Sequence, residues 1–286
     1  MAAKRKILLQ LDVDPLPSVF DRIVALDAGA DEVLAYGGVT PGNVVPLAQG
    51  AIFTRGPKDL SSTAIMIGGS NVPVAEEVMR IVRKTFLPQF GLSVSVLFDP
   101  NGASTTAAAT VLTVAKHIDI PTAQVLVMGP GPVGSRVAGL LARRGASVRL
   151  AGKTVLEAEE ACNRLASQKV EPVDTGSNLG AIDALAECHA VIAAGPAGTQ
   201  VLTRSAVQDS TSLRILVDLN AVPPPGIEGT SPTDQGDERD GRICYGALAI
   251  GDLKMKLHKA AIGRLFERSD LGLDVEEIAE LKTSTS

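Results

Sequence analysis

The sequence has no tryptophan, two tyrosines and three histidines, and its three cysteines stand far apart. Cys162, Cys188 and Cys244 form no CxxC pair, and three histidines are too few to suggest a structural zinc centre beside them. We therefore expect no metal site and no disulfide framework. Free, reduced cysteines are typical of cytoplasmic proteins, and the cytoplasm is the location that we predict.

Long apolar runs are also missing. No stretch approaches the ~18 consecutive apolar residues that a membrane-spanning helix requires. Residues 1–7 carry a basic cluster, but the apolar run that follows it breaks at Gln10 and Asp12. Because that run is too short for a secretory signal peptide, we predict no export and no membrane partner.

Basic residues are also fewer than acidic ones. Lys and Arg number 27 against 32 Asp and Glu, the net charge is −5 at pH 7, and no long basic run occurs. This balance argues against nucleic acid as a partner. The 286 residues, 45% hydrophobic and 21% charged, suit about two globular domains. Glycine is abundant, with 28 residues, which indicates tight turns or a close approach of the backbone to a ligand.

Short apolar runs alternate with segments of helical periodicity along the first half of the chain. The expected strands are Ile7–Asp12, Glu32–Tyr36, Ala64–Ile67 and Ser93–Phe98. Helices are expected to start between them, with Ser18 and Asn71 as caps and Pro41 at a first helical position. This order predicts a mostly parallel sheet covered by helices on both faces.

The same alternation restarts near Pro121 and is stronger there. The expected strands are Gln124–Met128, Ser147–Ala151, Val170–Val173, Ala190–Ala194, Leu213–Leu219 and Arg242–Tyr245, and the expected helices are Val133–Arg144, Thr154–Ser167 and about Gly251–Arg268. An Ala- and Thr-rich helix, Ser104–Lys116, joins the halves.

The predicted fold class is therefore α/β with two domains. An N-terminal α/β substrate domain is expected over residues 1–118, and a Rossmann-type dinucleotide-binding domain with a parallel sheet over residues 119–251. The C-terminal segment 252–286 is a candidate to pack back onto the first domain.

A G-x-G-x-x-G motif follows the strand at Gln124–Met128 and opens a helix. Gly129 would make the tight turn, Gly131 would let the backbone approach a pyrophosphate, and Gly134 would let the helix pack on the strand. The helix N-terminus, with Pro132 and Val133, would then attract the anion. The motif lies inside a complete β-α-β unit, which favours dinucleotide binding over a role of the glycines in packing only. A nucleoside triphosphate loop is excluded, because Ser135 and Arg136 stand where that motif requires Lys followed by Ser or Thr.

The end of the second strand of that unit indicates which dinucleotide is bound. An NAD site places Asp or Glu there, whereas this chain has Ala151-Gly-Lys-Thr154. Lys153 and the Thr154 hydroxyl suit a 2′-phosphate, so we predict NADP as the preferred cofactor and NAD as a second one. Arg149 would contribute if its side chain points outward. The alternative is that Lys153 is an ordinary solvated side chain.

Several motifs together resemble one family, the NAD(P)-dependent methylene-tetrahydromethanopterin dehydrogenases of one-carbon metabolism, and the resemblance covers nearly the whole chain. The motifs are Ser18-Val-Phe-Asp21, Tyr36-Gly-Gly-Val-Thr-Pro41 with Asn43-Val44, Phe53-Thr-Arg-Gly56, Asp99-Pro-Asn-Gly102 with Thr105-Thr-Ala-Ala-Ala109, Gly129-Pro-Gly-Pro-Val-Gly134, and Gly246–His258. Departures from the family pattern are the Pro in Asp99-Pro-Asn and the Gly-Lys-Thr at residues 152–154.

The resemblance implies a Rossmann domain beside a second α/β domain, a pterin substrate, and a homo-oligomer, typically a trimer. It also implies hydride transfer from methylene-tetrahydromethanopterin to NAD(P)⁺. That step moves no proton, so the absence of a Ser-His-Asp set or of paired catalytic carboxylates is expected.

Candidate ligand residues lie where strands end, since ligands of open α/β sheets bind there. On the substrate side they are Asp21, Tyr36, Asp99, Asn101 and, by the resemblance, Thr105. Each has a structural alternative: Asp21 can complete a capping box with Ser18, Asn101 and Asp99 suit turns, and Tyr36 can be an ordinary strand residue. On the dinucleotide side the candidates are Ala194, Gly195 and Asn220.

The last long helix carries further candidates. The resemblance makes Lys256 the first choice for a catalytic cation that faces the substrate, with Lys254 as the second. The alternative for Lys256 is an ion pair with Asp252 one turn earlier. His258 is expected to be a core or surface histidine rather than a catalyst.

Three rival functions remain open. A shikimate-type dehydrogenase shares the layout but needs a Lys shortly after the Thr40-Pro41 turn, and this segment has none. A methylene-tetrahydrofolate dehydrogenase differs only in its pterin, and a non-catalytic dinucleotide-binding sensor would keep the scaffold alone. In related bifunctional folate enzymes a Tyr-x-x-x-Lys pattern supports hydrolysis of the methenyl product. Because Thr40 follows Tyr36 in that pattern here, we predict no cyclohydrolase activity.

Overall fold

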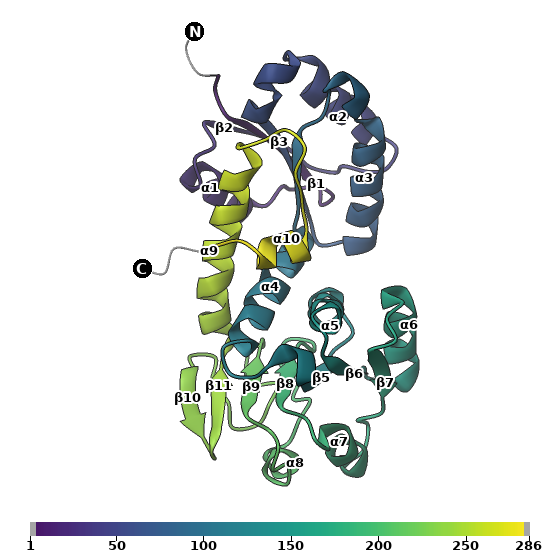
Figure 1. Ribbon diagram of the computed structural model, residues 1–286, viewed down its shortest axis with the longest axis vertical. Helices are drawn as coiled ribbons and strands as arrows, with labels where there is room; N and C mark the ends of the chain where they lie inside the picture. Colours follow the sequence, from purple (N-terminus) through teal and green to yellow (C-terminus); the bar gives the residue numbers. More distant parts are fainter. Residues whose placement is uncertain (1–3, 283–286) are drawn as a thin grey trace. The chain divides into compact units, whose positions relative to one another are not determined.

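The computed structural model describes residues 4–282, which form two compact units. The first unit contains the chain up to Thr105 and again from Met255 onward, and the second contains Thr106–Lys254. Each unit is built on its own sheet (Figure 1).

Both changes of unit fall inside helices. These are α4 (Ala103–Val114) and α9 (Ala247–Leu265), so the chain passes between the units twice. The strand pattern alone places the first boundary later, at residue 118, because the second run of strands begins only after α4 ends. It also starts the last long helix at residue 251, whereas α9 begins four residues earlier, at Ala247.

The first sheet has five parallel strands in the order β12-β4-β3-β1-β2. Their bounds are β1 Ile7–Asp12, β2 Glu32–Tyr36, β3 Thr63–Gly68, β4 Ser95–Phe98 and β12 Gly272–Leu273. The central strand β3 is buried along its whole length, which is why Thr63-Ala-Ile-Met-Ile-Gly68 is nearly all apolar.

Helices cover both faces of this sheet (Figure 1). The helices α2 (Val44–Phe53) and α3 (Val72–Thr85) bury their apolar sides against one face, in a core that includes Leu11, Ile65 and Val78. The predicted caps Ser18 and Asn71 are confirmed, since each side chain accepts a backbone N–H of α1 (Val19–Asp27) or α3. The expected start of α2 at Pro41 is wrong, and the helix begins at Val44. The reason is that the Asn43 side chain accepts the Thr40 N–H and donates to the Gly38 carbonyl, which holds the preceding residues in a turn.

The C-terminal segment completes the first sheet. After α9 the chain adds β12 beside β4 and ends in α10 (Val275–Ala279). The Ser95 hydroxyl donates to the carbonyl of Arg268 at 2.9 Å, and the Ser104 hydroxyl donates to Asp274 at 2.8 Å. These partly buried bonds make the end of the chain part of the first unit.

The second sheet has seven strands in the order β10-β11-β9-β8-β5-β6-β7. Their bounds are β5 Gln124–Met128, β6 Ser147–Ala151, β7 Val170–Val173, β8 Ala190–Ala193, β9 Ile215–Asp218, β10 Gln235–Arg239 and β11 Arg242–Tyr245. All neighbours are parallel except β10 and β11. Strand β10 is not predicted from the sequence, because it is exposed throughout and has no apolar pattern.

The helices of this unit are α5 (Pro132–Arg143), α6 (Val155–Leu165), α7 (Asn178–Leu185) and α8 (Arg204–Gln208). Short 3₁₀ helices occur at Pro57–Ser62, Pro88–Phe90, Pro100–Gly102 and Ile120–Thr122. Over residues 4–282, no helix combines the length and apolar character needed to cross a bilayer.

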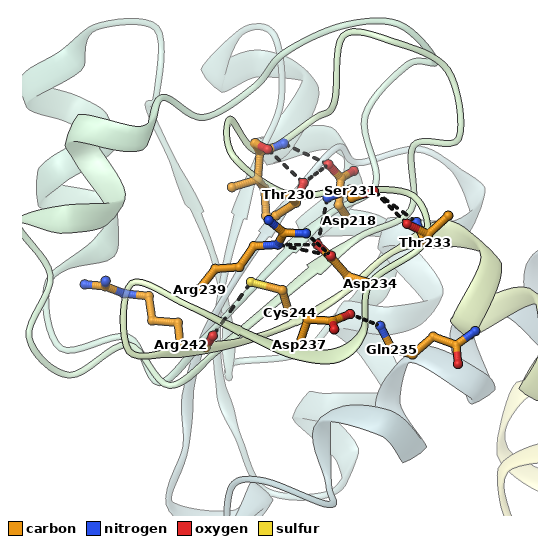
Figure 2. Close-up of polar contacts among 11 residues, drawn as sticks. Asp218, Thr230, Ser231, Thr233, Asp234, Gln235, Asp237, Arg239, Arg242 and Cys244 are labelled. Carbon is orange, nitrogen blue, oxygen red and sulfur yellow. Dashed lines mark hydrogen bonds and ion pairs between the residues drawn. The ribbon is translucent and has the colours of Figure 1, made fainter.

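A long connection leads from β9 to β10, and two buried aspartates hold it (Figure 2). Asp218 accepts the backbone N–H of Ile227 at 3.0 Å and the hydroxyl of Thr230 at 2.8 Å. Asp234 is paired with Arg239 at 2.6 Å. These bonds give a Pro- and Gly-rich segment a defined course along the sheet.

Candidate functional site

The glycine-rich turn between β5 and α5 can be built only from glycine at two positions. Gly129 has φ +115°, and a Cβ there would lie 2.4 Å from the carbonyl oxygen of Ala194. A Cβ on Gly134 would lie 1.9 Å from the carbonyl oxygen of Gly129. At Gly131 an added Cβ would meet no atom within 4 Å. The first and third glycines therefore permit close packing, while the second faces open space.

That space belongs to a cavity of about 710 Å³ in the second unit. Met128 and Ala151 line it and are level in the register of β5 and β6, and Ala194 and Gly195 line it just after β8. The chain leaves β5 towards β6 on one side and returns to β8 on the other. A crevice at the carboxyl ends of strands at such a switch point is where doubly wound sheets bind ligands.

The lining residues and the first turn of α5 suit a dinucleotide. Gly131 leaves its face of the turn open, which is the room that a pyrophosphate needs. Because Pro132 has no N–H, Val133 and Gly134 supply the first backbone donors at the positive end of α5. Lys153 adds a cation beyond the end of β6. The Gly131–Gly134 turn would hold the pyrophosphate, and Lys153 would face the ribose that carries any 2′-phosphate.

Four predicted cofactor residues are not among those that line the cavity, namely Val133, Gly134, Thr154 and Asn220. The Thr154 hydroxyl accepts the backbone N–H of Glu157 at 3.3 Å and so caps α6. The Asn220 side chain accepts the Gly198 N–H at 3.1 Å and donates to the Pro224 carbonyl at 2.9 Å. It therefore supports the loop that contributes Ala194 and Gly195.

The Arg149 side chain is bonded outside the cavity. Its guanidinium donates to the carbonyls of Ala184 at 3.0 Å and Ala186 at 2.6 Å, and it pairs with Glu171 at 3.3 Å. The condition for a contribution of Arg149 at a phosphate is thus not met, because these acceptors hold the side chain against the end of α7.

Three charged residues of α6 line the cavity that the sequence analysis did not single out. Glu157, Glu160 and Arg164 lie three and four residues apart, so they share one face of the helix. The spacing in the sequence indicates this shared face, but it does not indicate that the face lies at the end of β6. Among the described residues no set of three or more His, Cys, Asp or Glu is placed to hold a metal ion.

The carboxyl edge of the first sheet carries aspartates that are bonded within the unit. Asp12, 1% exposed, accepts the backbone N–H groups of Asp14 at 2.9 Å and Ser18 at 3.0 Å. Asp99, 2% exposed, accepts the backbone N–H of Thr105 at 3.0 Å and its hydroxyl at 2.7 Å. The predicted ligands Asp99 and Thr105 therefore contact each other and fix the start of α4.

Other predicted substrate residues are more accessible. Tyr36 ends β2 and is 38% exposed, and Asn101 is an exposed turn residue with φ 55°. Asp21 lies in the first turn of α1, with its backbone N–H bonded to the Ser18 hydroxyl at 3.2 Å. A Cβ built on Gly68 would lie 3.7 Å from carboxylate oxygens of both Asp12 and Asp21. Asp21 is thus brought to the ends of β1 and β3.

The two candidate lysines of α9 differ in their exposure. Lys256 is exposed, and no ion pair between it and Asp252 occurs among residues 4–282. Lys254 is half-buried. His258 is buried, with its ring 6.4 Å from that of Phe20, which agrees with the expectation of a core histidine.

Comparison with known proteins agrees with this arrangement. Residues 19–101 match the family described as methylene-tetrahydromethanopterin dehydrogenase, N-terminal, and residues 112–231 match shikimate / quinate 5-dehydrogenase. A shikimate dehydrogenase solved with NADP⁺ superposes with a TM-score of 0.53 at 14% identity, covering 98% of this chain and 95% of that one. Quinate dehydrogenase from Corynebacterium glutamicum, solved with NAD, gives 0.51 at 16%, covering 96% and 98%. These likenesses establish a two-domain α/β fold whose second domain is of the Rossmann type.

Two full-length relatives from Methylorubrum extorquens narrow the class. The bifunctional protein MdtA is 42% identical over 283 residues, covering 97% of this chain and 98% of that protein. An NAD(P)-dependent methylenetetrahydromethanopterin dehydrogenase is 31% identical over 303 residues, covering 97% of each. The chain belongs to the methylene-tetrahydromethanopterin dehydrogenase family, a family of oxidoreductases, as the sequence motifs indicate.

Proposed function

We propose that this protein oxidises methylene-tetrahydromethanopterin to the methenyl form with NAD(P)⁺, as a step of one-carbon (formaldehyde) metabolism. The observation that carries the proposal is full-length similarity to a dehydrogenase of this name in a chain that keeps the glycine-lined cavity. The experiment is NAD(P)H formation, followed at 340 nm, with methylene-tetrahydromethanopterin and each nicotinamide cofactor.

The proposed reaction requires no general acid or general base. A C–H bond of the methylene carbon breaks, and the hydrogen leaves with both electrons as hydride, which the nicotinamide accepts when the dinucleotide is bound. The two nitrogens beside that carbon stabilise the cation that forms. The chain's residues have to bind the two partners in a reactive geometry and exclude water.

NADP is the proposed preferred cofactor. The support is Lys153 in the cavity wall, with no ion pair to Glu157 or Glu160 among the described residues. Replacing Lys153 with Ala is expected to raise the KM for NADP⁺ by roughly ten- to a hundredfold and to leave that for NAD⁺ nearly unchanged. An equal loss with both cofactors would remove Lys153 from the 2′-phosphate site.

Substrate binding is proposed for Asp21, Tyr36 and Asn101, with Asp99 and Thr105 shaping the same edge. Lys256, and after it Lys254, are proposed as the cations that face the pterin. Lys256→Ala is expected to lower kcat strongly while leaving the Kd for NADPH intact. A normal kcat would assign Lys256 to the helix surface.

No cyclohydrolase activity is proposed, because Thr40 cannot act as an acid or base near neutral pH and its backbone N–H is tied to Asn43 at 2.7 Å. Purified protein given methenyl-tetrahydromethanopterin without nicotinamide should not accelerate the loss of its ultraviolet absorbance. Decay above the buffer rate that disappears in Lys256→Ala would contradict this.

A homo-oligomer in the cytoplasm is proposed as the working form. Val19, Ile23 and Leu26 form a stripe on α1 and are 69%, 55% and 46% exposed, an apolar surface that a second copy of the chain would cover. The trimer follows from the family resemblance. Light scattering during size-exclusion chromatography measures the number of copies, and a monomer at micromolar concentration would exclude it.

Methylene-tetrahydrofolate is the second candidate substrate, because its reacting ring system is alike and one relative is called bifunctional. The 340 nm assay with both pterins measures the preference. Dinucleotide binding without turnover of either pterin would instead support a sensor.

A further inference from the structure

We propose that Glu157 sets the ratio of NADP to NAD binding, an inference that rests on the proposed dinucleotide function. Glu157 lies in the first turn of α6, lines the cavity, and accepts the backbone N–H of Lys153 at 3.0 Å. This bond holds its carboxylate beside Lys153, the second residue after the end of β6. An acid therefore reaches the ribose position from the helix, although the strand itself ends without one.

The acid position is enforced by the local fold. A Cβ on Gly152 would lie 2.8 Å from the Thr154 carbonyl oxygen and 3.0 Å from the Cβ of Glu157, so the turn before α6 passes tightly against the helix. The Thr154 hydroxyl holds the Glu157 backbone at 3.3 Å. The carboxylate is thus fixed through its own backbone and through Lys153, and it can accept a hydrogen bond from a ribose 2′-hydroxyl.

Opposite charges share this wall of the cavity. Lys153 and Arg164 supply two cations, while Glu157 and Glu160 supply two anions, and among the described residues none of these side chains pairs with another. The cations attract a 2′-phosphate, whereas Glu157 repels it and favours a 2′-hydroxyl. This wall of the cavity therefore carries groups suited to NADP and a group suited to NAD. Glu157 is the group that lowers the affinity for the 2′-phosphate.

The variant Glu157→Gln tests this assignment. Its amide oxygen can still accept the Lys153 N–H, so the turn is kept while the negative charge is lost. The matched control is Glu159→Gln, which removes the same charge from the same helix at an exposed position that does not line the cavity. Because the chain has no tryptophan, NADPH and NADH fluorescence report binding without interference from indole.

The expected result is a change of roughly tenfold or more in the ratio of the two Kd values, in favour of NADPH, for Glu157→Gln only. Competition by 2′,5′-ADP against 5′-AMP should shift in the same direction, and the shift should shrink in high salt. An unchanged ratio, or an equal change in Glu159→Gln, overturns the inference while leaving dinucleotide binding in place. If the unaltered protein bound neither dinucleotide, the proposed function itself would fail, and the inference with it.

Discussion

The carboxyl edges of the two sheets differ in the groups that they present, backbone in the second unit and side chains in the first. In the second unit the glycine-rich turn presents its backbone to the cavity, at positions such as Gly129 and Gly131 where a side chain either cannot fit or would enter the open space. In the first unit the edge is made of side chains, and several of them are already bonded to their own turns. The glycine turn, whose second glycine faces the cavity, therefore marks the proposed binding surface more directly than an acid does.

A buried aspartate at a strand end serves the same purpose in both units. Asp12 ends β1, Asp99 follows β4 and Asp218 ends β9, and each accepts at least two hydrogen bonds from residues that follow it in the chain. Such a carboxylate fixes the course of the chain at the sheet edge. Its location at a sheet edge does not by itself assign it to the ligand.

The largest expected effect compares two glycines of the same turn. Gly134→Ala places a Cβ against the Gly129 carbonyl, so the turn must shift, and we expect loss of NADPH binding together with about 1–3 kcal/mol of stability. At Gly131 there is room for a Cβ, so Gly131→Ala should change the free energy of unfolding by less than about 0.5 kcal/mol. It should nevertheless weaken NADPH binding roughly tenfold or more. Urea unfolding and NADPH titration measure both quantities. Normal NADPH affinity in Gly131→Ala would mean that the dinucleotide does not approach this turn.

The next effect compares two aspartates of the first unit. Asp99→Ala removes the acceptor of the buried Thr105 backbone N–H and the shorter of the two bonds of the Thr105 hydroxyl, and it should cost about 1–3 kcal/mol in urea unfolding. Asp21→Ala should cost at most about 1 kcal/mol, since it removes an acid from the first turn of a helix, but should raise the KM for the pterin. Equal stability losses with unchanged KM would make both residues structural.

A smaller effect concerns pH and the second unit. Burial, and then the charge of Lys116, lower the pKa of His117 below its usual 6.5, and its Nε2 lies 3.0 Å from the Tyr245 hydroxyl. Because the unfolded chain takes up the proton first, this contribution to stability is complete above pH 6.5 and is lost as the pH falls through the lowered pKa.

Unfolding midpoints in urea at a series of pH values from 7.5 downwards would show this dependence, and His117→Gln should flatten it. Tyr245→Phe is the control, since it removes the hydrogen bond and keeps the burial. If Tyr245→Phe flattened the profile as much as His117→Gln, the hydrogen bond rather than burial would be the cause.

The smallest effect is an absence of reaction. All three cysteines are buried and lie in the second unit, and burial raises the pKa of Cys244 to about 11. We expect native protein at pH 8 to react negligibly with a thiol-specific disulfide reagent and fully denatured protein to release three equivalents. Labelling in mild denaturant would then report the opening of the second unit alone. Rapid labelling of the native protein would show that this unit opens readily.

Much of this organisation could be predicted from the sequence. The bounds of β5 and β6 and the glycine turn between β5 and α5 follow from local patterns, since apolar runs and glycine spacing are local properties. Strand β10 could not be predicted, because pairing with β11 creates it without any apolar residue. Glu157 was missed for a related reason: a helix brings it to the strand end across several residues of sequence.

The pairing of β12 with β4 has a consequence for synthesis. The first unit begins the chain, yet its sheet gains its last strand only when Gly272–Leu273 has been made. Until then β4 presents an open edge to other chains, the situation that favours misassociation in nascent proteins. The second unit, contiguous from Thr106 to Lys254, has all its strands earlier. On the ribosome, the part of the protein that emerges first is therefore the last to be completed.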